Sequence, residues 1–75
     1  MREEIKEILI ECGIDEKDLE CTDFVKAGFM DSMTVAEVAM GIEDKYQIDI
    51  DGKDIIPEWF MNIGTMESLV KKYLK

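Results

Sequence analysis

The sequence contains no histidine, and it has little proline, tryptophan and cysteine. The absence of His removes the commonest general base of enzymes, and no other group of side chains in the sequence supports a catalytic site. Two cysteines, Cys12 and Cys21, do not make a disulfide framework, so we expect both to be reduced. Since His and a Cys-x-x-Cys pair are both missing, we expect no metal site.

Basic residues are also scarce, because nine Lys and Arg stand against 18 Asp and Glu and give a net charge of −9. A field of this sign repels nucleic acids and anionic membranes, so neither is an expected partner. It favours proteins with basic docking patches. No apolar run approaches the length of a membrane span, and the acidic start of the chain is unlike a signal peptide. We therefore expect a cytoplasmic protein.

The length of 75 residues allows one domain at most, and we expect residues 1–75 to form a single domain. A domain of this size buries only about 60–65% of the surface of its unfolded chain. It has no room for both a core and a deep substrate cleft, which argues against a self-sufficient enzyme. We expect a monomer, since four helices can close their own core.

Apolar residues recur with the spacing of amphipathic helices in residues 2–12 and 32–46 and near the C-terminus. Pro57 suits the first position of a short third helix over Pro57–Phe60, and Thr65 is the expected N-cap of the last helix. Residues 14–31 form a long connection, and such connections are often functional. The pattern predicts an all-α fold, a small four-helix bundle with a long loop between helices 1 and 2 and a short third helix.

The most informative stretch runs from Gly28 to Tyr46 and reads GFMDSMTVAEVAMGIEDKY. Asp31 is a good helix N-cap, and Ser32 would follow it, exposed, in the first helical turn. A phosphate at that position meets free N–H donors at the positive end of the helix dipole. Taken alone, an Asp-Ser pair at a helix start is usually no more than a cap. Gly41, which is unusual inside a helix, indicates a close contact with another helix.

This stretch resembles the signature of the acyl and peptidyl carrier proteins: a Gly and an apolar pair, Asp-Ser with Leu or Met, then a helix ending in an aromatic residue. The order of helices and the long first loop extend the resemblance over most of the chain. It implies that Ser32 carries a covalent 4′-phosphopantetheine, moved from coenzyme A by a phosphopantetheinyl transferase with magnesium. Asp31 would help to place the serine and the metal. The resemblance implies a carrier of thioester-linked acyl or aminoacyl groups, not an enzyme.

The resemblance also makes the second helix the main recognition element. The residues expected to dock partners are Met33, Glu37, Met40, Glu43 and Asp44. They would meet basic patches on acyl- or aminoacyl-activating ligases and on downstream synthases or transferases. The alternative is that the methionines are further core residues. Residues 56–60 look more like the stand-alone carriers, including D-alanyl carrier proteins, and a fatty-acid, polyketide, peptide or D-alanyl role stays open.

Two other functions match parts of the sequence. An acidic helical interaction module without a prosthetic group would use Met33 and Met40 to bind a basic protein. A calcium-binding loop of the EF-hand type over residues 47–58 would use Gln47, Asp49, Asp51, Gly52 and Glu58. Three residues oppose calcium: Gln47 in the first ligand position, Asp54 where an apolar residue is normal, and Pro57 just before the last ligand.

Overall fold

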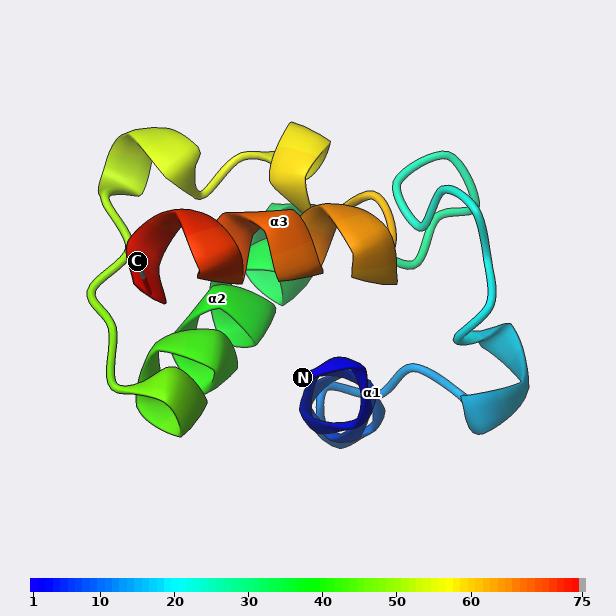
Figure 1. The fold of residues 1–75 in the computed structure, drawn as a ribbon. Coiled ribbons are helices and arrows are strands. Elements are labelled where there is room, and N and C mark those ends of the chain that lie inside the picture. The colour runs from blue at the N-terminus through cyan, green and yellow to red at the C-terminus, as the bar shows by residue number, and fades with distance from the viewer. Residues whose placement is uncertain (75) are drawn as a thin grey trace.

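In the computed structural model, which describes residues 1–74, the chain is folded entirely from helices and their connections (Figure 1). Its α-helices are α1 (Arg2–Glu11), α2 (Ser32–Tyr46) and α3 (Ile63–Leu74). Its short 3-10 helices are η1 (Glu16–Asp18), η2 (Gly52–Asp54) and η3 (Pro57–Phe60). Since residues 1–74 contain no strand, the predicted all-α class is confirmed for them.

The short third helix predicted at Pro57–Phe60 is the 3-10 helix η3, with Pro57 in its first turn. A 3-10 helix has poorer hydrogen-bond geometry than an α-helix and rarely exceeds four residues. Three α-helices therefore frame the part of the chain that the structure describes, and η3 stands where the bundle was expected to have its fourth. None of these helices is long and apolar enough to cross a membrane.

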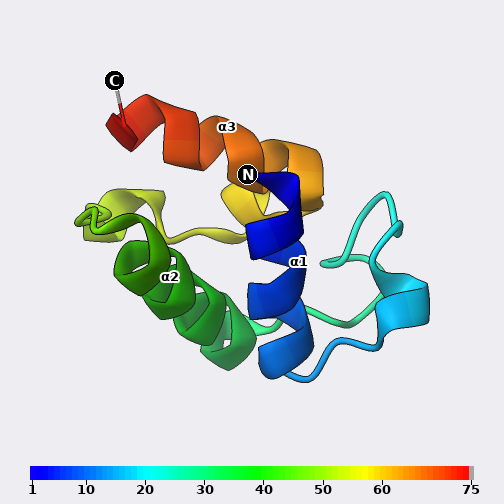
Figure 2. The same cartoon turned by 60° about the horizontal axis from the view of Figure 1, so that its bottom comes forward.

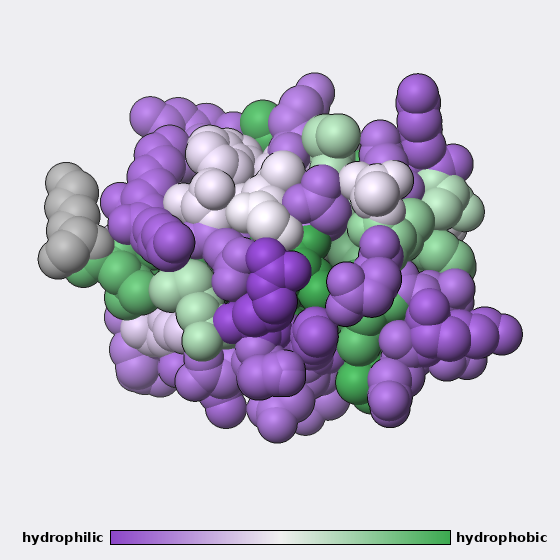
Figure 3. Space-filling view, turned by 45° about the vertical axis from the view of Figure 1, so that its right-hand side comes forward, coloured by the Kyte–Doolittle hydropathy of each residue, from purple (hydrophilic) through white to green (hydrophobic). Residues whose placement is uncertain are grey.

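The core lies where the three α-helices meet. In Figures 1 and 2, α1 and α2 run beside each other and α3 lies across them, and η3 packs against both α2 and α3. The largest fully buried side chains are Phe24, Phe60, Ile5, Leu9, Ile42, Met66, Leu69, Val38 and Val70. Hydrophilic side chains cover most of the face shown in Figure 3, and apolar atoms form narrow patches between them.

Gly41 lies where α2 is in tight contact with α1. A Cβ atom at this position would lie 2.8 Å from Cγ2 of Ile8, inside the van der Waals contact distance. Ile8 is buried, and its β-branched side chain has little freedom to turn away within a helix. The expected helix–helix contact at Gly41 is confirmed, and it explains a glycine that costs the helix about 1 kcal/mol relative to alanine.

We expect Gly41→Val to lower the free energy of unfolding by about 2 kcal/mol, because the added methyl groups force α1 and α2 apart. Gly41→Ala should cost less, since the gain in helix propensity offsets part of the clash. Urea unfolding of both variants measures the difference. A Gly41→Val protein as stable as the wild type would contradict the close contact.

The N-terminus of α3 corrects one prediction. Asn62, not Thr65, caps this helix: its Oδ1 accepts the Thr65 N–H at 2.9 Å, and Thr65 Oγ1 accepts the Asn62 N–H at 3.2 Å. This reciprocal pair is a capping box, so the helix begins at Ile63. The prediction of a Thr65 cap was wrong because Gly64 suggests a helix break, whereas here it lies inside the first turn.

Asp54 is the buried charged residue of the described chain, with 6% of its surface exposed. Its Oδ2 lies 2.8 Å from Nζ of Lys72 and also accepts the hydroxyl hydrogen of Tyr73. Lys72 Nζ lies 5.5 Å from the centre of the Trp59 ring, close enough for a cation–π contact. The hydrogen bonds from Lys72 and Tyr73 hold the pKa of the Asp54 carboxyl below its ordinary value. The cluster fastens η2 and η3 to the C-terminal part of α3.

This lowered pKa predicts how stability depends on pH. The folded state binds the Asp54 proton less tightly than the unfolded chain does. The ionised carboxylate therefore makes its full contribution to the free energy of unfolding above the ordinary aspartate pKa of about 3.9. This contribution is lost as the pH falls through the lower pKa that Asp54 has in the folded state. We expect Asp54→Asn to have a lower Tm than the wild type at neutral pH. Below about pH 4, the Tm of the variant should decrease less with falling pH than the Tm of the wild type. Thermal unfolding measured from neutral pH to below pH 4 tests this prediction, with a substitution of the exposed Asp49, Asp49→Asn, as control. The same dependence of Tm on pH in Asp54→Asn and the wild type would contradict the role of the cluster.

Candidate functional site

The connection between α1 and α2 ends at the candidate site, and Phe24 anchors this connection to the core. Phe24 is fully buried, and its N–H donates to the carbonyl oxygen of Met61 at 2.6 Å. Its own carbonyl accepts the N–H groups of Phe29 and Met30 at 2.9 and 3.3 Å. Asn62 adds a second tie, because its Nδ2 donates to the carbonyl of Thr22 at 3.0 Å. The last residues before α2 are therefore held, through Phe24, by the two residues that precede α3.

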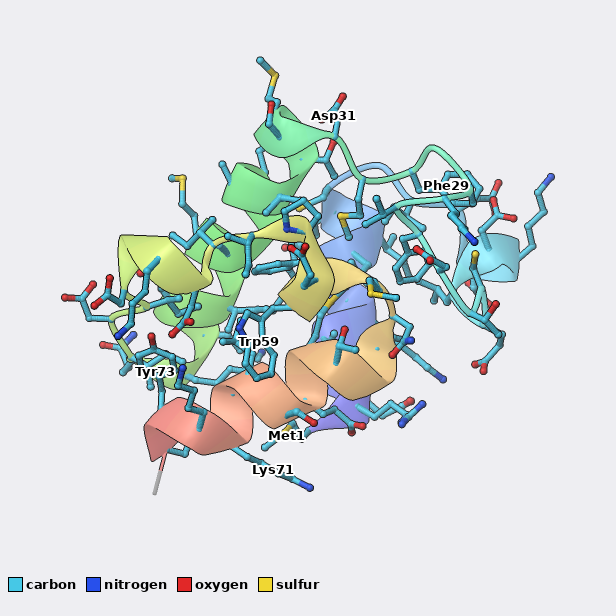
Figure 4. All side chains as sticks on the ribbon, turned by 90° about the horizontal axis from the view of Figure 1, so that it is seen from above. Met1, Phe29, Asp31, Trp59, Lys71 and Tyr73 are labelled. Carbon is cyan, nitrogen blue, oxygen red and sulfur yellow. The ribbon has the colours of Figure 1, made fainter. Side chains whose placement is uncertain are left out.

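Asp31 and Ser32 lie where this connection enters α2. Asp31 has extended backbone and is the N-cap, and its Oδ1 accepts the Thr34 N–H at 2.8 Å. This hydrogen bond is the main reason why the pKa of the Asp31 carboxyl lies below its ordinary value. Ser32 is the first residue of α2 and is exposed, as the sequence predicts. Figure 4 shows Asp31 at the outer end of α2, away from Trp59 and Tyr73.

We expect Asp31→Ala to lower Tm by about 4–8 °C, because the variant leaves the Thr34 N–H without its cap. Asp31→Asn should stay close to the wild type, since asparagine is an equally good N-cap. Thermal unfolding followed by circular dichroism compares the two. A loss of stability in Asp31→Asn as large as in Asp31→Ala would show that charge, not capping, is what Asp31 contributes to the fold.

Ser68 provides an internal comparison, because the sequence holds only two serines, Ser32 and Ser68. Both side chains are exposed. Ser68 lies in the interior of α3 and follows Glu67, whose carboxylate pairs with Arg2 at 2.7 Å. Backbone N–H groups inside a helix bond to the preceding turn, so only Ser32 has free donors beside it at the positive end of a helix dipole.

The five predicted docking residues all lie on α2, but they are not equally available. Met33 and Met40 are 73% and 66% exposed, and Glu37 and Asp44 are exposed as well. The two methionines therefore do not belong to the core. Glu43 is half-buried, and its Oε2 accepts the Ile50 N–H at 2.8 Å, which ties the end of α2 to the next segment.

Several residues of the candidate calcium loop have other roles in the fold. Gln47 ends α2 in the left-handed backbone conformation, with φ of 54°. Asp51 accepts the Lys53 N–H at 3.1 Å, and Asp54 is engaged by Lys72 and Tyr73. Over residues 1–74, no three side chains among His, Cys, Asp and Glu are grouped so that they could hold a metal ion.

Cys12 and Cys21 are both half-buried, and both are free thiols in the structure. Burial raises the pKa of the Cys12 thiol, and the negative charges of Glu37 and Glu11 raise it further. A thiol with a raised pKa holds less of the reactive thiolate at neutral pH, so Cys12 is a poor nucleophile.

Comparison with known proteins identifies the family of this chain. Residues 3–71 match the phosphopantetheine attachment site family. Since this match covers most of the chain, the protein belongs to that family. No curated protein and no solved structure matches the chain. Domains of this family attach a 4′-phosphopantetheine group, act as carriers without being catalytic themselves, and interact with phosphopantetheinyl transferases and synthases.

The geometry around Ser32 fits such a group. Asp31, Ser32 and Met33 are exposed in succession, so a long polar arm on Ser32 can extend into solvent without displacing core side chains. A phosphodiester on Ser32 would lie at the positive end of the 15-residue helix α2, where the dipole favours a negative charge. The Asp31 carboxylate adds a like charge nearby, which a cation bound between the two groups would offset.

Proposed function

We propose that Ser32 is the residue that carries 4′-phosphopantetheine and that the protein carries acyl or aminoacyl groups on it between partner enzymes. One observation above all supports this: of the two serines, Ser32 alone begins a helix, behind an aspartate N-cap, at the end of a loop anchored to the core. The thiol of the arm, once attached, supplies the thioester chemistry.

In the attachment reaction Ser32 Oγ bonds to the phosphorus atom next to the pantetheine unit of coenzyme A. The pyrophosphate P–O bond breaks, adenosine 3′,5′-bisphosphate leaves, and a base of the transferase takes the serine proton. The chain itself presents Ser32 at a fixed position, because Asp31 holds the first turn through the Thr34 N–H. The second Asp31 oxygen and its negative charge are suited to a magnesium ion that the transferase brings.

Partner binding is assigned in this proposal to the exposed residues of α2. Met33 and Met40 give adaptable apolar contacts, and Glu37 and Asp44 give negative charge for basic patches. Met40 and Asp44 also line a shallow hollow with Ile48 and Asp49. Glu43 lies beside this surface and accepts a hydrogen bond from the Ile50 N–H. A small, charged surface of this kind favours weak binding, which lets a carrier leave one partner for the next.

The test is the intact mass of the wild-type protein after incubation with coenzyme A, magnesium and a broad-specificity phosphopantetheinyl transferase. We expect a gain of one phosphopantetheine. A folded protein that gains none would contradict the proposal, and it would favour the alternative in which α2 binds a basic partner without a prosthetic group.

A further inference from the structure

We infer that this carrier holds a short or polar acyl group that stays in solvent, and that it does not take a long alkyl chain into its interior. The inference rests on the proposed function, because it concerns what the arm on Ser32 carries. It is drawn from how the interior next to α2 is filled and from how the segment covering it is fastened.

The space behind the first turns of α2 is occupied by side chains. Met30, Val35, Val38 and Phe60 belong to one buried cluster, and each is no more than 5% exposed. Protein interiors pack as densely as organic crystals, so a guest chain must push such side chains out of their rotamers. An alkyl chain entering beside Ser32 would have to displace this cluster.

Residues 47–60, which we term the strap, form most of the connection between α2 and α3. η3 in the strap packs against both helices, and Phe60 is fully buried. Because η3 contacts both helices, an alkyl chain that entered between α2 and α3 would have to move the strap outward.

The first half and the middle of the strap are held by polar contacts that would break on opening. Its first half is tied to α2 by the Ile50 N–H, which donates to Glu43 Oε2 at 2.8 Å. Its middle is tied to α3, because the Asp51 N–H donates to Tyr73 Oη at 3.1 Å and Asp54 pairs with Lys72 and Tyr73. Lifting the strap separates the Asp54 carboxylate from these donors, which makes opening unfavourable.

The surface hollow beside the C-terminal part of α3 offers an alkyl chain little shelter either. The hollow along the strap is lined by Asp49, Asp51, Lys53, Asp54, Lys72 and Tyr73. An apolar chain lying there would remove charged groups from water without pairing them. A short acyl group, or one with its own amine or hydroxyl, has no need of such shelter and can remain on the arm in solvent.

The experiment compares the protein loaded by a transferase from acetyl-coenzyme A and from octanoyl-coenzyme A. Intact mass first establishes that each arm is on the protein, so failure to load counts against the proposed function and not against this inference. Methyl spectra of Val35, Val38 and Ile42 then report on the interior, and hydroxylamine cleavage of the thioester reports on its exposure.

We expect the core methyl signals to be the same for the two cargoes, and octanoyl-protein to be cleaved within about twofold of the rate for octanoyl-coenzyme A. Core methyl shifts specific to octanoyl, with cleavage slowed about tenfold or more, would overturn the inference. Asp54→Asn loosens the strap and should let octanoyl shift these methyl signals, whereas exposed Asp49→Asn should not. If octanoyl leaves the core methyl signals of Asp54→Asn as unchanged relative to the acetyl form as it does in the wild type, the role given to the strap is overturned.

Discussion

Ser32→Ala is expected to abolish attachment of phosphopantetheine completely, since the variant removes the oxygen that bonds to phosphorus. The fold should be unaffected, because Ser32 is exposed and the cap of α2 is provided by Asp31. We expect the free energy of unfolding to stay within about 0.5 kcal/mol of the wild type. Intact mass after incubation with coenzyme A and transferase measures the first effect, and urea unfolding measures the second.

Ser68→Ala is the matched control, because Ser68 is the other serine of the chain and is also exposed. This variant should accept one phosphopantetheine at the wild-type rate, because position 68 lies inside α3 and plays no part in attachment. Attachment to Ser32→Ala, or its loss in Ser68→Ala, would move the carrier site to α3 and contradict the assignment.

Phe24→Ala is expected to have the largest effect on stability. Phe24 is fully buried, its ring packs edge-on against Phe29, and the backbone around it ties the first loop to Met61. Truncating a buried Phe to Ala costs about 3–5 kcal/mol. A domain of 75 residues has a total stability of only about 4–11 kcal/mol, so this variant should be largely or partly unfolded at 37 °C.

Phe29→Ala is the comparison for this effect, because Phe29 lies in the same loop but is only half-buried. It should lose clearly less stability than Phe24→Ala in urea unfolding. Phe24→Leu keeps most of the apolar volume and should fall between the wild type and Phe24→Ala. Equal losses for Phe24→Ala and Phe29→Ala would show that the loop is not anchored at Phe24.

Much of the fold follows from patterns that are local in sequence. The apolar stripe of α2 is buried as its spacing predicts, and Asp31 caps the helix because its carboxylate reaches an N–H three residues ahead. Pro57 begins η3 for an equally local reason, since its fixed φ suits a first helical position. Gly41 indicated that some helix approaches α2 closely, although only the structure identifies Ile8 as the contact.

Features that depend on distant parts of the chain could not be found in this way. Asp54 looked like a misplaced residue in a calcium loop, and its partners Lys72 and Tyr73 are 18 and 19 residues away. Glu43 shares the acidic character of its neighbours on α2, but only folding brings Ile50 to it. The Asn62 cap was missed although Asn and Thr three residues apart is a recognisable capping pattern.

The most direct test of the central claim is to locate the modification on the wild-type protein. After incubation with coenzyme A, magnesium and a phosphopantetheinyl transferase, the protein is digested and the peptides are fragmented in a mass spectrometer. We predict one phosphopantetheine, placed by the fragment ions on Ser32. A folded protein with no modified peptide, or with the group on Ser68, would contradict the account of Ser32 as the carrier residue.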